Sequence, residues 1–274
     1  MRVRIIDVGN TTGDPVNRIF ASLRDKEHET NGSKGIRLTS DSADVVHVMG
    51  PWTRKTCHAI DRQRQRDIPV VYTCTDALQS IANLRRPTPA MKKIMKSAST
   101  IHVSGQTEQQ QLEAWFPITP IALILNPLLT ASTTEAEAME AFSKLYEQVI
   151  KSNQEQVREN IKVTVGNLKQ SDENIAELCR QVLYAQHFYL RGFLPKPLLD
   201  DLTALLTTRD YDESQFAGAL ESLKSYTFAA RLMHILRQTT QLTEGFMPIA
   251  ELADKEAQAA LGHILTPEEG LWWA

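Results

Sequence analysis

Short apolar runs separated by polar, helix-like stretches mark the first half of the chain. Five of these runs are rich in β-branched residues and end at turn formers; they cover residues 3–8, 43–49, 70–74, 99–104 and 121–125. A short run that is apolar at nearly every position is typical of a strand buried on both faces of a sheet. Strands that alternate with helices need crossover connections, and these produce a parallel sheet. The pattern therefore predicts an α/β domain over residues 1–130 with a Rossmann-like, doubly wound parallel sheet.

The second half of the chain has a different rhythm. From residue 131 onward, apolar side chains recur at intervals of three and four, as in the run that begins at Met139. This spacing gives each helix an apolar stripe that must pack against a neighbour. It predicts an all-helical domain over residues 131–274, packed as a bundle or against the sheet. Residues 161–165 alternate with a period of two and fit either a short strand or the end of a helix.

The composition is that of a globular protein, with 42% hydrophobic and 23% charged residues in 274. The apolar runs are all shorter than the roughly 18 to 20 residues that a membrane-spanning helix requires. The apolar stretch at the N-terminus carries Arg4 and lacks a cleavage signal, which argues against a secretory leader. The three cysteines are widely spaced and form no CxxC motif, which disfavours a disulfide framework or a metal site. We therefore expect a cytoplasmic protein without metal or cofactor.

The net charge of -3 conceals an asymmetry along the chain. Residues 1–130 carry a net charge of +5 and the remainder carries -8. Several cations gather in two predicted helical segments, and they fit either a solvated outer face or a surface that attracts an anionic membrane. The sequence pI of about 6.2 and the lack of a known RNA- or DNA-binding motif argue against a nucleic-acid partner. The clustered cations are Arg62, Arg64, Arg66, Arg85, Arg86, Lys92, Lys93 and Lys96.

Ligands of doubly wound sheets bind beyond the carboxyl ends of the strands. That edge of the predicted sheet is where polar and turn-forming residues follow each apolar run. A loop of this kind can offer backbone N–H groups to a phosphate, or it can be a plain turn from strand to helix. The predicted ligand-binding residues are Gly9, Asn10, Thr11, Gly13, Gly50, Trp52, Thr75, Ser104 and Asn126.

Two residues are candidates for proton transfer, and each also has a structural interpretation. Asp76 directly follows the third predicted strand and fits either a catalytic base or a helix N-cap. His47 lies inside an apolar strand and fits either a functional imidazole or a buried, hydrogen-bonded one. Trp52 could stack on a sugar or a base, or fill the joint between the two domains. The pair Trp272 and Trp273 would be a costly exposed patch, so we expect it to dock on a groove or a second subunit.

Five segments, taken in order, resemble the N-terminal half of GT-B glycosyltransferases, in particular the large retaining group called family four. The segments read IIDVGNTTGDP, ADVVHVMGPW, IPVVYTCTDA, ASTIHVSGQTEQQQLEAWFP and IALILNPLLT. The resemblance implies a Rossmann-like domain that takes part in sugar transfer. It also implies that the sugar-nucleotide half is missing, because residues after 130 show neither strand-helix alternation nor the family's Glu-x7-Glu pair in a suitable context. Thr75 stands where the family has a histidine that contacts the sugar.

The resulting expectation is a glycosyltransferase-like protein that binds a saccharide, a sugar nucleotide or a sugar-linked acceptor. The alternative is a non-catalytic scaffold that uses the same fold to bind a protein partner or another copy of itself. In the enzymatic version, Asp76 or His47 lies near the acceptor and the loop at Gly9 lies near a phosphate.

Overall fold

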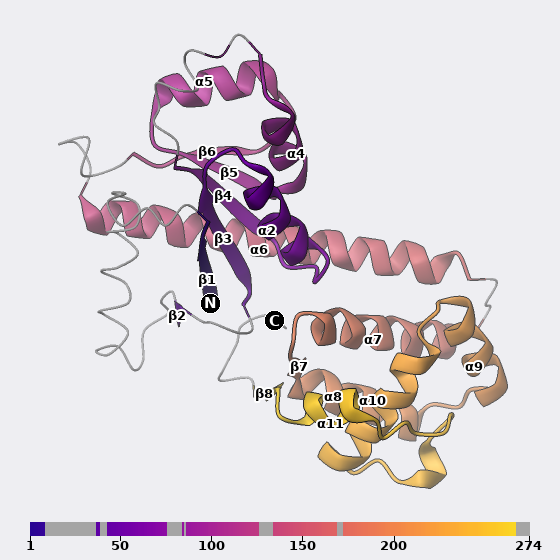
Figure 1. Cartoon of the computed structure of the whole chain (residues 1–274). Coiled ribbons are helices and arrows are strands. Elements are labelled where there is room, and N and C mark those ends of the chain that lie inside the picture. The colour runs from indigo at the N-terminus through magenta and orange to yellow at the C-terminus, as the bar shows by residue number, and fades with distance from the viewer. Residues whose placement is uncertain are drawn as a thin grey trace. The chain divides into compact units, whose positions relative to one another are not determined.

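The computed structural model describes residues 1–8, 37–38, 43–75, 84, 86–125, 134–168 and 172–266 (Figure 1). The chain divides into two compact units, residues 1–153 and 154–274. We call the first the sheet unit and the second the helical unit. The sheet unit takes in residues beyond 130, where the sequence analysis placed the end of the first domain.

The sheet unit is built on a six-stranded parallel sheet, which confirms the predicted α/β class. The strands lie in the order β2-β1-β3-β4-β5-β6 and every neighbouring pair is parallel. The sequence analysis did not predict the second strand, which has only two residues. The strands are β1 (Arg2–Asp7), β2 (Arg37–Leu38), β3 (Val45–Gly50), β4 (Val70–Cys74), β5 (Thr100–Val103) and β6 (Ile121–Leu123).

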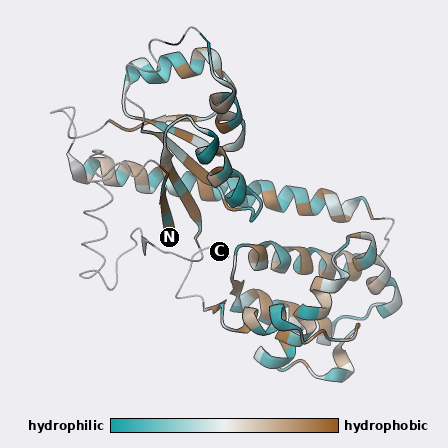
Figure 2. Ribbon diagram, viewed as in Figure 1, coloured by the Kyte–Doolittle hydropathy of each residue, from teal (hydrophilic) through white to brown (hydrophobic). Residues whose placement is uncertain are grey.

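Three helices, α2 (Arg54–Arg64), α4 (Pro89–Ser97) and α5 (Gln106–Trp115), pack on one face of this sheet. The side chains of Thr53 and Thr88 accept hydrogen bonds from backbone N–H groups in the first turns of α2 and α4, so each helix begins at a capped end. The core on this face joins strand residues to apolar positions of all three helices. Figure 2 shows hydrophobic strands beside a largely hydrophilic α2, as expected for a helix with one buried stripe.

The long helix α6 (Glu135–Gly166) packs its first turns on the opposite face of the sheet. It begins with a reciprocal pair of bonds: Thr134 N–H donates to the Glu137 carboxylate, and Glu137 N–H donates to the Thr134 hydroxyl. Phe142 and Tyr146 are buried in the core of this face. Residues 161–165 are helical, which settles the alternative that the sequence left open.

The helical unit packs five helices around a second core that the far end of α6 also joins through Ile161 and Val165. A two-residue parallel ladder pairs β7 (Leu194–Pro195) with β8 (Ile264–Leu265). The sequence analysis predicted helices alone in this region, because a two-residue ladder is too short to leave a periodic pattern. The helical elements are α7 (Glu173–Leu190), α8 (Lys196–Thr208), α9 (Glu213–Ser222), α10 (Tyr226–Thr239), the 3-10 turn η1 (Glu244–Phe246) and α11 (Lys255–Leu261).

Gly50 ends β3 at a close contact between β1 and α2. A Cβ atom there would lie 3.0 Å from Cβ of Val8 and 3.1 Å from Oγ1 of Thr56. We expect Gly50→Ala to lower the free energy of unfolding by about 2 kcal/mol, since overpacking forces neighbours to move. Gly218→Ala in α9 is the control, because its Cβ meets nothing within 4 Å and should raise stability by about 0.5 kcal/mol. Denaturant titration measures both, and equal effects would contradict the steric account.

Candidate functional site

The order of the strands reverses between β1 and β3, because β2 lies on one side of β1 and β3 to β6 lie on the other. At such a reversal the chain leaves neighbouring strands in opposite directions, which opens a crevice at their carboxyl ends. We call the carboxyl ends of the strands the carboxyl edge. Six of the predicted site residues lie outside the described part of the chain: Gly9, Asn10, Thr11, Gly13, Asp76 and Asn126.

At the end of β3, Gly50 is held by hydrogen bonds to its carbonyl. The Tyr72 hydroxyl donates to this carbonyl at 2.7 Å, and the Thr75 N–H donates to it at 3.2 Å. Because a Cβ atom at this position would lie 3.0 Å from Cβ of Val8, the glycine is needed for close packing, which accounts for its place in the sequence without a ligand. A predicted ligand contact through its backbone stays a prediction.

Trp52 follows at the start of the turn into α2. Its ring centroid lies 4.9 Å from that of Tyr72, and its side chain packs against the core that the sheet forms with α2, α4 and α5. Trp52 is half-buried, so one part of the indole is fixed by packing and the rest is accessible. Such an indole is preorganised for stacking because it loses little conformational freedom when a ligand binds.

The ends of β4 and β5 add polar groups to the same edge. Thr75 follows β4 and Ser104 follows β5, and both are half-buried. Glu108, in the first turn of α5, is only 8% exposed. Burial raises the pKa of Glu108 to about 7, although a hydrogen bond from the Ser104 backbone offsets part of the increase. A carboxyl group with a pKa near neutrality can both donate and accept a proton.

The sequence analysis missed Glu108. A glutamate three residues after the N-cap Gly105 is common at the start of a helix, so its presence in the sequence does not indicate a functional site. Its burial arises from the packing of α5 on the sheet, which the sequence does not display. Its position near the carboxyl edge could nevertheless have been predicted, because it lies in the helix turn that directly follows a strand end.

A second polar feature lies inside the sheet unit, on the face covered by α6. His47 contacts the Tyr146 hydroxyl through Nδ1 at 2.6 Å and the Thr73 hydroxyl through Nε2 at 2.6 Å. Thr73 in turn contacts Nδ1 of His102 at 2.7 Å, and Nε2 of His102 lies 3.2 Å from the Ile124 carbonyl oxygen. All four side chains are at most 3% exposed. We call these four residues the buried chain.

The carbonyl at one end determines every proton in the buried chain. The pKa of His102 is lowered to about 4, so its imidazole is neutral at pH 7; because the Ile124 carbonyl can only accept, Nε2 of His102 donates to it and Nδ1 is left as an acceptor. Thr73 must then donate to His102 and accept from Nε2 of His47. Tyr146 therefore donates to Nδ1 of His47, and both imidazoles are neutral with their protons on Nε2.

The charge states agree with this proton arrangement. Burial, with a smaller effect of His102, holds the pKa of His47 well below its usual value. Burial lowers the pKa of His102 to about 4 and raises that of Tyr146 well above its usual value. All three groups are neutral at pH 7. The structure places His47 in the middle of β3, away from the carboxyl edge, so a catalytic role for it stays a prediction.

Seven of the eight clustered cations lie on α2, α4 and the segments next to them, and Arg85 lies outside the described residues. These two helices pack against each other, and an ion pair of 2.5 Å joins Lys93 of α4 to Asp61 of α2. Arg62, Arg64, Lys92 and Lys96 are exposed. The outer surface of these helices is therefore cationic, and membrane attraction stays a prediction.

The described residues can be compared with the requirements of metal sites and of reactive thiols at Cys57 and Cys179. No group of three or more histidine, cysteine, aspartate or glutamate side chains within them could hold a metal ion. Burial raises the pKa of the Cys57 thiol, and it raises that of Cys179 to about 11, so neither forms a reactive thiolate at pH 7. Among the same residues, no helix is both long and apolar enough to cross a bilayer.

The fold and the carboxyl edge define an α/β protein with a Rossmann-like parallel sheet. Comparisons with protein-family models, with curated proteins and with solved structures find no match to this chain.

Proposed function

We propose that the sheet unit is a glycosyltransferase-like module that binds a saccharide or a sugar-linked acceptor at its carboxyl edge. The observations that carry this proposal are a half-buried, packed Trp52 just beyond β3 and a protonatable Glu108 just beyond β5, at the same edge of the sheet. The two strands are separated by β4 alone. An indole offers an apolar face to a sugar ring, and a carboxyl group near its pKa can donate to or accept from sugar hydroxyls.

Binding without transfer is the version that we favour. Thr75 directly follows β4, at the position where the family that the sequence resembles has a histidine, and threonine cannot contribute an imidazole. Glu108 remains available as a general acid or base because its pKa lies near 7. A transferase of this kind would also require a sugar-nucleotide-binding half.

The test is a panel of free saccharides, lipid-linked sugars and sugar nucleotides, measured by heat-shift and calorimetry. A ligand at about 100 times its Kd should stabilise the sheet unit by about 2.7 kcal/mol. We expect Trp52→Phe and Glu108→Gln each to weaken binding about tenfold. The matched controls are Trp115→Phe and Glu113→Gln, both in α5, which should leave affinity unchanged.

The outcomes of this panel decide between the versions. Binding without hydrolysis or transfer supports the module, and transfer in the presence of a sugar nucleotide supports the enzyme. If no member of the panel stabilises the protein, the saccharide proposal is wrong and the scaffold alternative remains. Equal losses in the variants and their controls would place the ligand elsewhere.

A further inference from the structure

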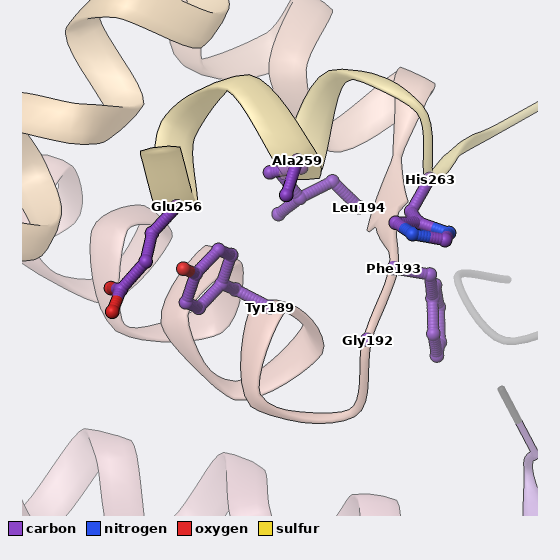
Figure 3. A pocket seen from close by; sticks show the side chains of 8 residues that line it. Tyr189, Gly192, Phe193, Leu194, Glu256, Ala259 and His263 are labelled. Carbon is purple, nitrogen blue, oxygen red and sulfur yellow. The ribbon is translucent and has the colours of Figure 1, made fainter. Parts of the chain in front are cut away.

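A cavity of about 220 Å3 lies between the end of α7 and α11 in the helical unit, and it is open to solvent where Glu256, Ala259 and His263 are exposed. It is lined by Tyr189, Gly192, Phe193, Leu194, Glu256, Ala259, Ala260 and His263 (Figure 3). Most of this lining is apolar, and its polar groups stand at the ends. We call it the α7–α11 cavity.

The end of α7 shapes one wall of the cavity. Gly192 has a positive φ of 88°, and its N–H donates to the Tyr189 carbonyl at 2.9 Å. The Phe193 N–H donates to the Phe188 carbonyl at 3.2 Å, which completes a Schellman motif, and the two rings lie 5.4 Å apart. This turn fixes Phe193 and Tyr189 as walls. The Leu194 N–H then donates to the His263 carbonyl at 3.0 Å, which fixes the opposite rim.

Helix α11 leaves the space open because it presents alanines. Ala259 and Ala260 line the cavity where larger side chains would fill it. Figure 3 shows the Tyr189 ring beside Glu256 at one end, and the rings of His263 and Phe193 at the other. Planar side chains at both ends suit a flat aromatic ligand, since aromatic pairs gain from stacked or edge-on contact.

The polar end carries a negative charge. The Tyr189 hydroxyl is hydrogen-bonded to Glu256, and Arg231 binds both Glu256 at 2.5 Å and Asp254 at 2.7 Å. Two carboxylates therefore share one guanidinium, so these three side chains together carry a charge of about -1. A ligand with an amino group complements that charge, and one with a carboxylate opposes it.

The volume limits the size of the ligand. A dry protein cavity of about 150 Å3 holds benzene, which has six heavy atoms. By the same ratio, 220 Å3 accommodates about nine heavy atoms, the size of a bicyclic ring such as indole, and the open side of the cavity leaves room for a substituent on the ring. We propose that the α7–α11 cavity binds a small bicyclic aromatic amine, with its ring between Tyr189 and Phe193 and its amino group at Glu256. This site is separate from the proposed saccharide site.

The test uses the full chain with tryptamine, indole and indole-3-acetate as probes, measured by ligand-observed NMR and calorimetry. We expect tryptamine to bind with a Kd on the order of 1 mM or tighter, indole to bind more weakly, and indole-3-acetate to bind weakest. Ala259→Phe should fill the cavity and abolish binding of all three. Ala204→Phe, at an exposed position of α8, is the matched control and should change nothing.

Glu256→Gln tests the charge separately from the shape. It should cut the preference for tryptamine over indole-3-acetate at least fivefold, whereas Glu221→Gln on α9 should leave that preference intact. Failure of all three probes to bind would overturn the proposal, as would binding that survives Ala259→Phe. Indole-3-acetate binding as tightly as tryptamine would overturn the assignment of an amine. If no probe binds the parent protein and Ala259→Phe changes the oligomeric state, the proposal is also wrong. The occupant of the cavity would then be a second copy of the chain.

Discussion

Thr73→Val should lower the free energy of unfolding of the sheet unit by about 3 kcal/mol, although the two side chains have nearly the same shape. Thr73 stands in the middle of the buried chain, where its hydroxyl contacts His47 and His102 at 2.6 and 2.7 Å. Valine would leave Nε2–H of His47 and Nδ1 of His102 without this partner. Each buried polar group that loses its hydrogen bond costs about 1 to 3 kcal/mol.

Related variants separate the hydroxyl from the shape of the side chain. Thr73→Ser keeps the hydroxyl and should lose only about 1 kcal/mol, through the missing methyl group. Tyr146→Phe removes a partner from His47 alone and should fall between the two. Thr164→Val, at an exposed position of α6, should stay within about 0.5 kcal/mol of the parent protein. Denaturant unfolding measures the series. A loss for Thr73→Val no larger than that for Thr164→Val would mean that the buried chain does not stabilise the fold.

The strands of the sheet unit were predictable because apolar runs bounded by turn formers are a local signal. The predicted runs at 43–49 and 70–74 match β3 and β4 to within two residues at each end. Helix α4 is equally local, since Thr88 supplies the cap and Pro89 occupies the first turn. In each case the residues that decide the structure lie within one element.

The buried chain could not be predicted, because its members are far apart in the sequence. Tyr146 is 99 residues from His47, and His102 is 29 residues from Thr73. A strand buried on both faces also lacks the alternation that would tell which face a histidine occupies. The sequence was therefore compatible with either a functional or a buried His47. Its position facing α6 is known only from the pairing of β3, β4 and β5 in the structure.

The position of the carboxyl edge could be predicted from the sequence, but only some of the residues that form it could. The rule that ligands lie beyond the strand ends selected Gly50, Trp52, Thr75 and Ser104, which follow or end neighbouring strands. Glu108 escaped because its distinguishing property is burial, and burial depends on how α5 meets the sheet. In the sequence, a glutamate that merely begins a helix cannot be distinguished from one that is buried against the sheet.

Glu108→Gln should stabilise the sheet unit at pH 8 by up to about 3 kcal/mol, and this gain should disappear near pH 4.5. The pKa of Glu108 is about 7 in the folded protein, against 4.5 for a glutamate that the fold does not perturb. Between these two pH values, the folded state therefore binds one more proton than the unfolded state. Stability of the parent protein therefore increases as the pH falls through this window. At about 1.4 kcal/mol per pH unit, the difference between 7 and 4.5 is worth about 3 kcal/mol.

The buried histidines act in the opposite direction over almost the same window. The pKa of His102 is about 4 when folded against 6.5 for the unmodified group, so the unfolded chain binds the extra proton and stability is lost as the pH falls from 6.5 to 4. In the parent protein these two effects on stability oppose each other. Glu108→Gln removes the contribution of Glu108, so the loss of stability caused by protonation of histidine becomes measurable. Urea titrations from pH 4.5 to 8 on the parent, Glu108→Gln and the exposed control Glu113→Gln measure this. A pH-independent difference between parent and Glu108→Gln would show that Glu108 ionises normally, and it would remove the proton-transfer capacity on which the proposed saccharide site relies.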